Sequence, residues 1–171
     1  MSVSDTFFSW ADFETEAPEL AARGRERIAR FGIVHMGTIR RDGTPRISPI
    51  DAHFVRGSLT LVMIPGTHKL ADVRRDPRIV LNALVDDAAN HVSVEFKIRG
   101  CVVAVDDAKL RTATADTIAA DSGWRPPEHW AMFAVEVENA AYIEWEKGLM
   151  RMDHWARGKG LDYVERSINL Q

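Results

Sequence analysis

The sequence predicts a mainly β fold of antiparallel strands with short flanking helices. Two turn signals, Asp42-Gly43 and Arg56-Gly57, separate apolar runs in the first half of the chain. Glycine accepts the positive φ that tight hairpin turns require. From His91 to Arg99 polar and apolar residues alternate strictly, which is the period of a half-buried strand. The helical patterns are partial or thin, so strands dominate the prediction.

Composition narrows the class of protein. The 171 residues fit one domain with a single core, and the net charge of −3 provides no electrostatic footprint for nucleic acid or an anionic membrane. The single cysteine, Cys101, excludes an internal disulfide and fits a reducing compartment. The N-terminus lacks the features of a signal peptide, and no apolar window approaches transmembrane length. We therefore expect a cytoplasmic protein that binds neither nucleic acid nor membrane.

The N-terminal region should pack on the body of the protein. Residues 1–17 contain four aromatic side chains, which are many for a free tail. A partial helical stripe follows over residues 18–31, with Pro18 in its first turn and Gly32 just beyond its end. We expect one short helix ahead of the first strand.

The first two strands are predicted over residues 33–40 and 46–55. The Asp42-Gly43 turn joins them into a hairpin. Pro49 cannot donate a ladder hydrogen bond, so it marks either an edge or a bulge in the second strand.

A third strand leads into a helix start. Residues 59–64 form a continuous apolar run, which Pro65-Gly66 ends. Thr67 is the predicted N-cap of a helix that begins near His68. Its free backbone N–H groups and positive dipole end, flanked by Lys69, would form an anion site. The alternative is an ordinary capped helix with a solvated lysine.

The middle of the chain predicts two more strands and a surface helix. The strands cover residues 79–85 and 91–105. Gly100 interrupts the second, as expected where a long strand bends or another backbone approaches closely. Asp106-Asp107 then cap a helix that runs to about residue 121.

The last third predicts an aromatic loop and a final hairpin. Residues 123–130 contain two tryptophans and two prolines, so this loop either roofs a pocket or fills a subunit interface. Residues 132–137 and 141–145 supply a last strand. A turn at Lys147-Gly148 joins that strand to residues 149–155, and a polar tail follows.

Three motifs follow one another in the first half of the chain. They are Gly43-Thr44-Pro45-Arg46-Ile47-Ser48-Pro49, Gly66-Thr67-His68-Lys69 and Arg74-Arg75-Asp76-Pro77-Arg78. In this order they resemble the FMN-binding split β-barrel family, which is related to pyridoxamine 5′-phosphate oxidase and includes deazaflavin-dependent reductases. The resemblance runs from about residue 33 to residue 104, with a weaker echo over 132–145.

The resemblance implies a six-stranded antiparallel split β-barrel with flanking helices. The single domain would comprise an N-terminal arm and helix (1–31), a barrel (32–155) and a C-terminal tail (156–171). In this family two barrels pack together and the flavin lies in the groove between them. A homodimer with the cofactor at the subunit groove is therefore expected.

The resemblance also implies which residues bind the cofactor. The Arg of the Pro-Arg strand and the Ser/Thr-x-Lys corner hold the flavin phosphate. The candidate cofactor-binding residues are Arg46, Ser48, Met63, Ile64, Thr67, His68 and Lys69. The oxidases usually have arginine where this chain has His68, which weakens one phosphate contact. FMN is the expected cofactor, a deazaflavin coenzyme the alternative, and haem the least favoured ligand.

No other catalytic chemistry is visible in the sequence. The six histidines show no metal-ligand spacing, and the chain contains neither a Walker loop nor a Rossmann glycine fingerprint. We assign no metal site and no catalytic residue. A flavin enzyme needs neither, because the ring transfers the electrons while the protein supplies a phosphate anchor, a platform and a substrate cavity.

Two departures from the family pattern bear on the substrate. Pyridoxamine 5′-phosphate oxidases carry Arg-x-His-Asp-Arg near the C-terminus, where this chain has Arg151-Met152-Asp153-His154-Trp155. They also use a Tyr and an Arg in the helix region, whereas residues 109–121 contain no Tyr and only Arg111. We therefore expect an FMN-dependent oxidoreductase of a small molecule other than a B6 vitamer. The alternatives are a deazaflavin-dependent reductase of the same fold and a non-catalytic flavin- or haem-binding protein.

Overall fold

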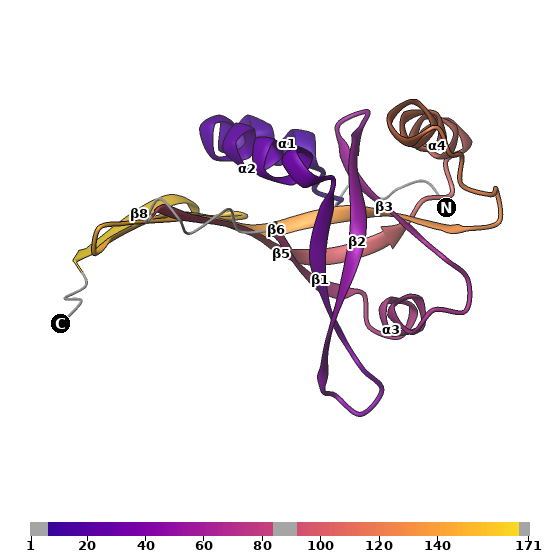
Figure 1. The fold of residues 1–171 in the computed structure, drawn as a ribbon, viewed down its shortest axis with the longest axis horizontal. Coiled ribbons are helices and arrows are strands. Elements are labelled where there is room, and N and C mark those ends of the chain that lie inside the picture. Colours follow the sequence, from indigo (N-terminus) through magenta and orange to yellow (C-terminus); the bar gives the residue numbers. More distant parts are fainter. Residues whose placement is uncertain (1–6, 84–91, 168–171) are drawn as a thin grey trace.

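The computed structural model describes residues 7–83 and 92–167. These residues contain eight antiparallel strands in one sheet and four helices (Figure 1). The strands are β1 (Ile33–Ile39), β2 (Pro45–Val55), β3 (Ser58–Met63), β4 (Arg78–Ala83), β5 (Val92–Ala104), β6 (Ala131–Glu146), β7 (Leu149–Ala156) and β8 (Gly160–Ser167). The helices are α1 (Trp10–Glu16), α2 (Pro18–Phe31), α3 (His68–Arg75) and α4 (Ala108–Ser122).

Six of the strands close into a barrel, as predicted. The sheet order is β3-β2-β1-β4-β5-β6, and β3 pairs again with β6 from Thr60–Ala134 to Met63–Ala131. A barrel of this size fills its interior with side chains. Val34, Met36, Leu61 and Val135 are among the residues buried there.

The predicted strands and turns are mostly confirmed. The Asp42-Gly43, Arg56-Gly57 and Lys147-Gly148 turns each join two paired strands. The predicted strand at 79–85 is observed as β4, although residues 84 and 85 lie outside the described residues, as does His91. The two halves predicted for the last barrel strand form one continuous strand, β6.

Two strands extend the sheet beyond the barrel. β7 pairs with β6, and β8 pairs with β7 from Leu149–Ser167 to Ala156–Gly160. The strand count is therefore eight rather than six, and the polar tail expected from residue 156 contains β8. β8 could not be predicted from the sequence. It is an edge strand with nearly all its residues exposed, so it does not need the alternation of apolar and polar residues that marks a half-buried strand.

A bulge opposite Gly100 separates the barrel from this extension. Arg99 faces Asn139 but Gly100 faces Val137, so Glu138 is an extra residue in β6. A Cβ atom on Gly100 would lie 1.8 Å from the backbone oxygen of Glu136. Of the two alternatives predicted for Gly100, the close backbone approach is confirmed. Beyond the bulge, β5 and β6 leave the barrel together with β7 and β8 as a flat extension, which we call the wing (Figure 1).

The N-terminal arm packs on the barrel and the wing, as expected, but it forms two helices rather than one. Ser9 and Asp12 make a capping box that starts α1. Trp10 and Phe13 are fully buried, and the Phe13 ring lies 4.8 Å from the Trp155 ring of β7. Pro18 opens α2 and Gly32 ends it in the left-handed conformation.

Helix α4 covers part of the outer face of the barrel. Asp107 caps it by accepting a 2.7 Å hydrogen bond from the Leu110 N–H, as predicted. Leu110 packs against a small cluster that contains Met132 and Ala134 of β6. In the part of the chain that the structure describes, none of the helices has the length and apolar character needed to cross a membrane.

Candidate functional site

Helix α3 is fastened along the β1–β2 hairpin by three side-chain contacts, one per helical turn. Lys69 Nζ donates to the Pro49 carbonyl at 2.6 Å. Arg46 Nε donates to Asp72 Oδ2 at 2.6 Å, and Arg75 donates to the Ile39 carbonyl. Positions 69, 72 and 75 are three apart, so they share one helix face. This face holds the start of α3 beside the strand that contains Arg46.

The strand edge explains the role of Pro49. The β1–β2 register runs without a break from Ile39–Pro45 to Ile33–Asp51, so no bulge lies beside Ser48. Among the residues that the structure describes, β3 pairs with β2 over residues 52–55 only, so the first half of β2 has no strand partner there on that side. Pro49 therefore protects an edge, and its carbonyl is available to Lys69.

Asp72 organises the cations around it. Its side chain is only 5% exposed and accepts hydrogen bonds from Thr38 Oγ1 at 3.0 Å, Arg46 Nε at 2.6 Å and Arg75 at 3.3 Å. Burial opposes ionisation, yet the hydrogen bonds from Arg46, Thr38 and Arg75 together hold the pKa of Asp72 below its usual value. The role of Asp72 could not be predicted from the sequence, because two of its partners, Thr38 and Arg46, come from β1 and β2.

The lowered pKa of Asp72 predicts acid-sensitive stability. A carboxylate with a depressed folded pKa stabilises the fold above its unfolded pKa and loses that contribution as the pH falls through the folded value. Asp72→Asn should lower the free energy of unfolding by about 1–2 kcal/mol at pH 7, because the amide keeps its shape and both arginines stay partly solvated. Urea unfolding at pH 7 and pH 3 should show the deficit narrowing at pH 3. An unchanged deficit would contradict this role, and Asp51→Asn, at an exposed position of β2, is the control.

The two predicted phosphate-binding cations keep spare donors. Arg46 uses Nε for Asp72 and Lys69 uses one N–H for Pro49, so both have further N–H groups available. Lys69 is half-buried, and this burial lowers its pKa although the charge of Asp51 opposes the shift. An anion beside Lys69 would offset that desolvation.

The remaining predicted residues fall into two groups. Ser48 is half-buried and shares a strand face with Arg46, and His68 is exposed at the first turn of α3. Thr67 precedes α3 as predicted, but its hydroxyl donates to the Ile64 carbonyl at 2.8 Å instead of capping the helix. We call Arg46, Ser48, Thr67, His68 and Lys69 the α3 corner. Outside it, Met63 has its side chain fully buried in the core, and Ile64 is exposed on the surface.

A basic depression adjoins the α3 corner. Its volume is about 620 Å³, and it lies between the tip of the β1–β2 hairpin and α3. The lining residues are Arg40, Arg41, Asp42, Arg46, His68, Ala71, Asp72 and Arg75. Arg46 and His68 belong to both the depression and the corner.

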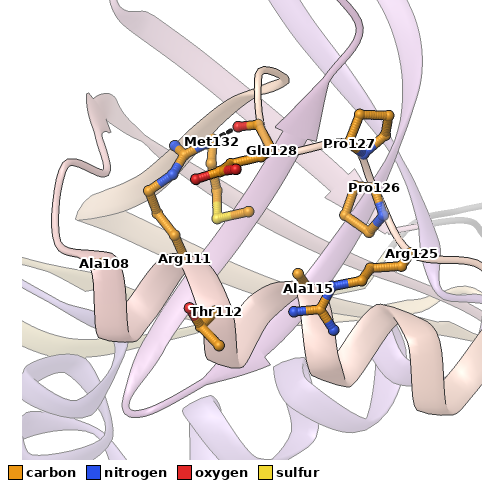
Figure 2. Close-up of a pocket in the computed structure, with 9 residues that line it drawn as sticks. All are labelled: Ala108, Arg111, Thr112, Ala115, Arg125, Pro126, Pro127, Glu128 and Met132. Atoms are coloured by element: carbon orange, nitrogen blue, oxygen red, sulfur yellow. Dashed lines mark hydrogen bonds between the residues drawn. The ribbon is translucent and has the colours of Figure 1, made fainter.

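A second hollow lies between the aromatic loop and α4 (Figure 2). Its volume is about 460 Å³, and α4, Pro126, Pro127 and Met132 contribute to its walls. Arg111 donates to the carbonyls of Val105, Glu128 and Trp130 at 3.1, 2.7 and 3.1 Å, which fastens the loop to α4. The loop therefore lines a hollow, one of the two roles predicted for it, and Arg111 holds it in place.

Known structures identify the fold. No family model and no curated protein matches the chain by sequence. PhzG from Burkholderia lata 383, solved in complex with tetrahydrophenazine-1-carboxylic acid, is similar with a TM-score of 0.61 and 13% identity over 95% of this chain and 98% of that one. A haem-binding protein from Mycobacterium smegmatis is similar with a TM-score of 0.60 and 12% identity over 86% and 88%. A NimC/NimA family protein from Clostridium acetobutylicum has a TM-score of 0.61 and 11% identity over 90% and 96%. The fold is the antiparallel split β-barrel.

Proposed function

We propose that this chain binds FMN at the α3 corner and is a flavin-dependent oxidoreductase of a small molecule. The observation that carries the proposal is the approach of Lys69, Arg46 and the N-terminus of α3 to one open edge of β2. A phosphate there would meet two cations with spare N–H donors and the positive end of a helix. Bound FMN would supply the electron transfer, and the chain would anchor its phosphate and exclude water from the ring.

The proposed substrate is a small molecule other than a B6 vitamer. The side chains of β7 that replace the oxidase motif are engaged elsewhere. Arg151 pairs with Glu165 and Asp153 with Arg23, while Trp155 is fully buried. Asp153 and Trp155 are therefore unavailable to recognise a pyridoxamine ring, and Arg151 is already paired on the wing.

A homodimer is part of the proposal. Ile47, Gly37 and Val80 are neighbours on adjacent strands of the outer barrel face, and Ile47 is 75% exposed. Exposed apolar residues grouped in this way favour an interaction surface. The cofactor would lie in the groove between the two subunits, as the family resemblance implies.

Haem binding without turnover is the second candidate. It is favoured by the similarity to the haem-binding protein from Mycobacterium smegmatis, and haem carboxylates would suit the same cations. A deazaflavin coenzyme, also a phosphate ester, would fit the corner by the same argument as FMN. The absorbance spectrum and mass of the small molecule released from purified protein would distinguish the three ligands.

Lys69 is the sharpest probe of the α3 corner. Lys69→Ala should weaken FMN binding by about 10- to 150-fold, because a charge-assisted hydrogen bond contributes roughly 1.5–3 kcal/mol. Titration of the apo-protein, followed by flavin fluorescence, measures this. Lys159→Ala removes the same charge from the exposed β7–β8 turn and should leave the affinity unchanged. Equal FMN affinity of wild type and Lys69→Ala would mean that the α3 corner is an ordinary helix start and not a phosphate site.

A further inference from the structure

The basic depression concentrates positive charge in a chain whose net charge is −3. Four arginines and two aspartates line it, which leaves a net charge of +2 with His68 neutral. Both carboxylates are already engaged. Asp72 accepts hydrogen bonds from Arg46 and Arg75, and Asp42 accepts from the N–H and hydroxyl of Thr44 at 3.0 and 2.6 Å.

The arginines at the hairpin tip differ in how far the protein neutralises them. Arg40 donates to the Thr44 hydroxyl at 3.3 Å, and it also faces Asp42, whose pKa is lowered by hydrogen bonds from Thr44 and by the charge of Arg40. Arg41 is exposed and makes no hydrogen bond or ion pair with any residue in 7–83 or 92–167. The positive charge of Arg41 is therefore available to an external anion.

The walls of the depression are held in place by hydrogen bonds within the hairpin tip and between the hairpin and α3. Arg40 N donates to the Thr44 carbonyl at 2.8 Å, and Gly43 N donates to the Arg40 carbonyl at 2.9 Å, so the hairpin tip is closed. Arg75 joins the opposite wall, α3, to the Ile39 carbonyl at the base of the hairpin. An anion would meet a preformed site, which reduces the entropy lost on binding.

We propose that the depression binds a second anionic group, so that the ligand of this chain carries a diphosphate or an equivalent pair of anions. This inference rests on the proposed function, because the first anion occupies the α3 corner. Arg46 lines both places and connects them. Arginine suits this task because its fork of N–H groups matches phosphate oxygens. A second anion site would favour a dinucleotide, or a coenzyme with an acidic extension, over a simple mononucleotide.

Inorganic anions test the proposal without assuming the identity of the cofactor. Calorimetric titration of the apo-protein with phosphate and with pyrophosphate should give the tighter binding for pyrophosphate. Arg41→Ala should weaken pyrophosphate binding by about fivefold, a modest loss because an exposed guanidinium is partly screened by solvent. Phosphate binding should not change. Arg74→Ala is the matched control, since it removes the same charge from an exposed position of α3 that does not line the depression.

The outcomes separate this inference from the proposed function. Equal pyrophosphate affinity of wild type and Arg41→Ala would overturn the second subsite, and a Lys69→Ala loss of FMN affinity would still support the corner. A parallel loss in Arg41→Ala and Arg74→Ala would also overturn it, because the effect would then come from overall charge. The source of the second anion is resolved by comparing FMN with FAD and with a deazaflavin coenzyme. Only a ligand that uses the subsite should lose affinity in Arg41→Ala.

Discussion

Gly100→Ala is expected to destabilise the protein by about 3 kcal/mol or more, at or beyond the upper end of the usual overpacking cost. The added Cβ would lie 1.8 Å from the backbone oxygen of Glu136. A backbone oxygen in a paired strand cannot rotate away as a side chain can, so β5 and β6 would have to separate at the bulge. For a chain of this length the melting temperature should fall by roughly 6–12 °C, at 2–4 °C per kcal/mol.

Thermal unfolding of Gly100→Ala and Gly37→Ala tests whether the close approach causes the effect. Gly37 also lies within a strand and has no positive φ, but the one close contact of its Cβ would be Val80 Cγ1 at 2.7 Å, with two backbone oxygens at ordinary distances of 3.8 and 4.0 Å. Val80 is 40% exposed in the single subunit and can adjust there, so Gly37→Ala should change the stability of the monomer by no more than about 1 kcal/mol. Equal stability of the two variants would show that the strands yield at the bulge.

Trp10→Ala is expected to cost about 3–5 kcal/mol, the usual loss for a large aromatic side chain in a core. Trp10 is fully buried, and its ring lies 4.7 Å from Phe54 of β2 and 6.4 Å from Phe96 of β5. Removing it would leave a cavity between α1 and the strands. Urea denaturation should show a lower midpoint and one cooperative transition if the arm belongs to the same folding unit as the barrel.

Two further variants separate the volume of Trp10 from its polar atom. Its buried Nε1 has no hydrogen-bond acceptor among the residues that the structure describes. Trp10→Phe removes that unsatisfied donor and keeps most of the apolar contact, so its cost should be much smaller than that of Trp10→Ala. Trp124 is 47% exposed, and Trp124→Ala should cost about 1 kcal/mol or less. A Trp10→Ala variant no less stable than Trp124→Ala would mean that the arm adds nothing to the fold.

Features with a local cause could be predicted from the sequence. Asp42 accepts the hydrogen bond from Thr44 N inside its own turn, and Asp107 accepts one from Leu110 N inside its own helix start. Such contacts lie within three residues, so residue type and spacing are enough to predict them. The start of α3 was predictable for the same reason. The hydrogen bond of the Thr67 hydroxyl could not be predicted, because the same sequence allows this hydroxyl either to donate to the Ile64 carbonyl or to cap the helix.

Features with a distant cause could not be predicted. Gly24 is a poor helix former by residue type, yet in α2 it makes room for the Phe96 ring, whose Cζ atom would lie 2.2 Å from an added Cβ. The residues next to Asp72 in the sequence do not indicate that it is buried. Its hydrogen-bond donor Thr38 lies 34 residues earlier in the chain. The basic depression likewise combines the hairpin tip with α3. In each case the partners lie on different elements, and only the topology brings them together.

The pairing of β3 with β6, which we call the seam, closes the sheet into a barrel. The sequence separation of its partners sets the entropy cost of that closure. The seam joins Thr60 to Ala134 and Met63 to Ala131, partners that are 74 and 68 residues apart. Closing loops of that length from a free chain costs about 4 kcal/mol of entropy beyond a constant. The β6–β7–β8 meander pairs neighbours across short turns and avoids most of that cost. We therefore expect the seam to form after β4 and β5 have paired, because those pairings shorten the loop that the seam must close.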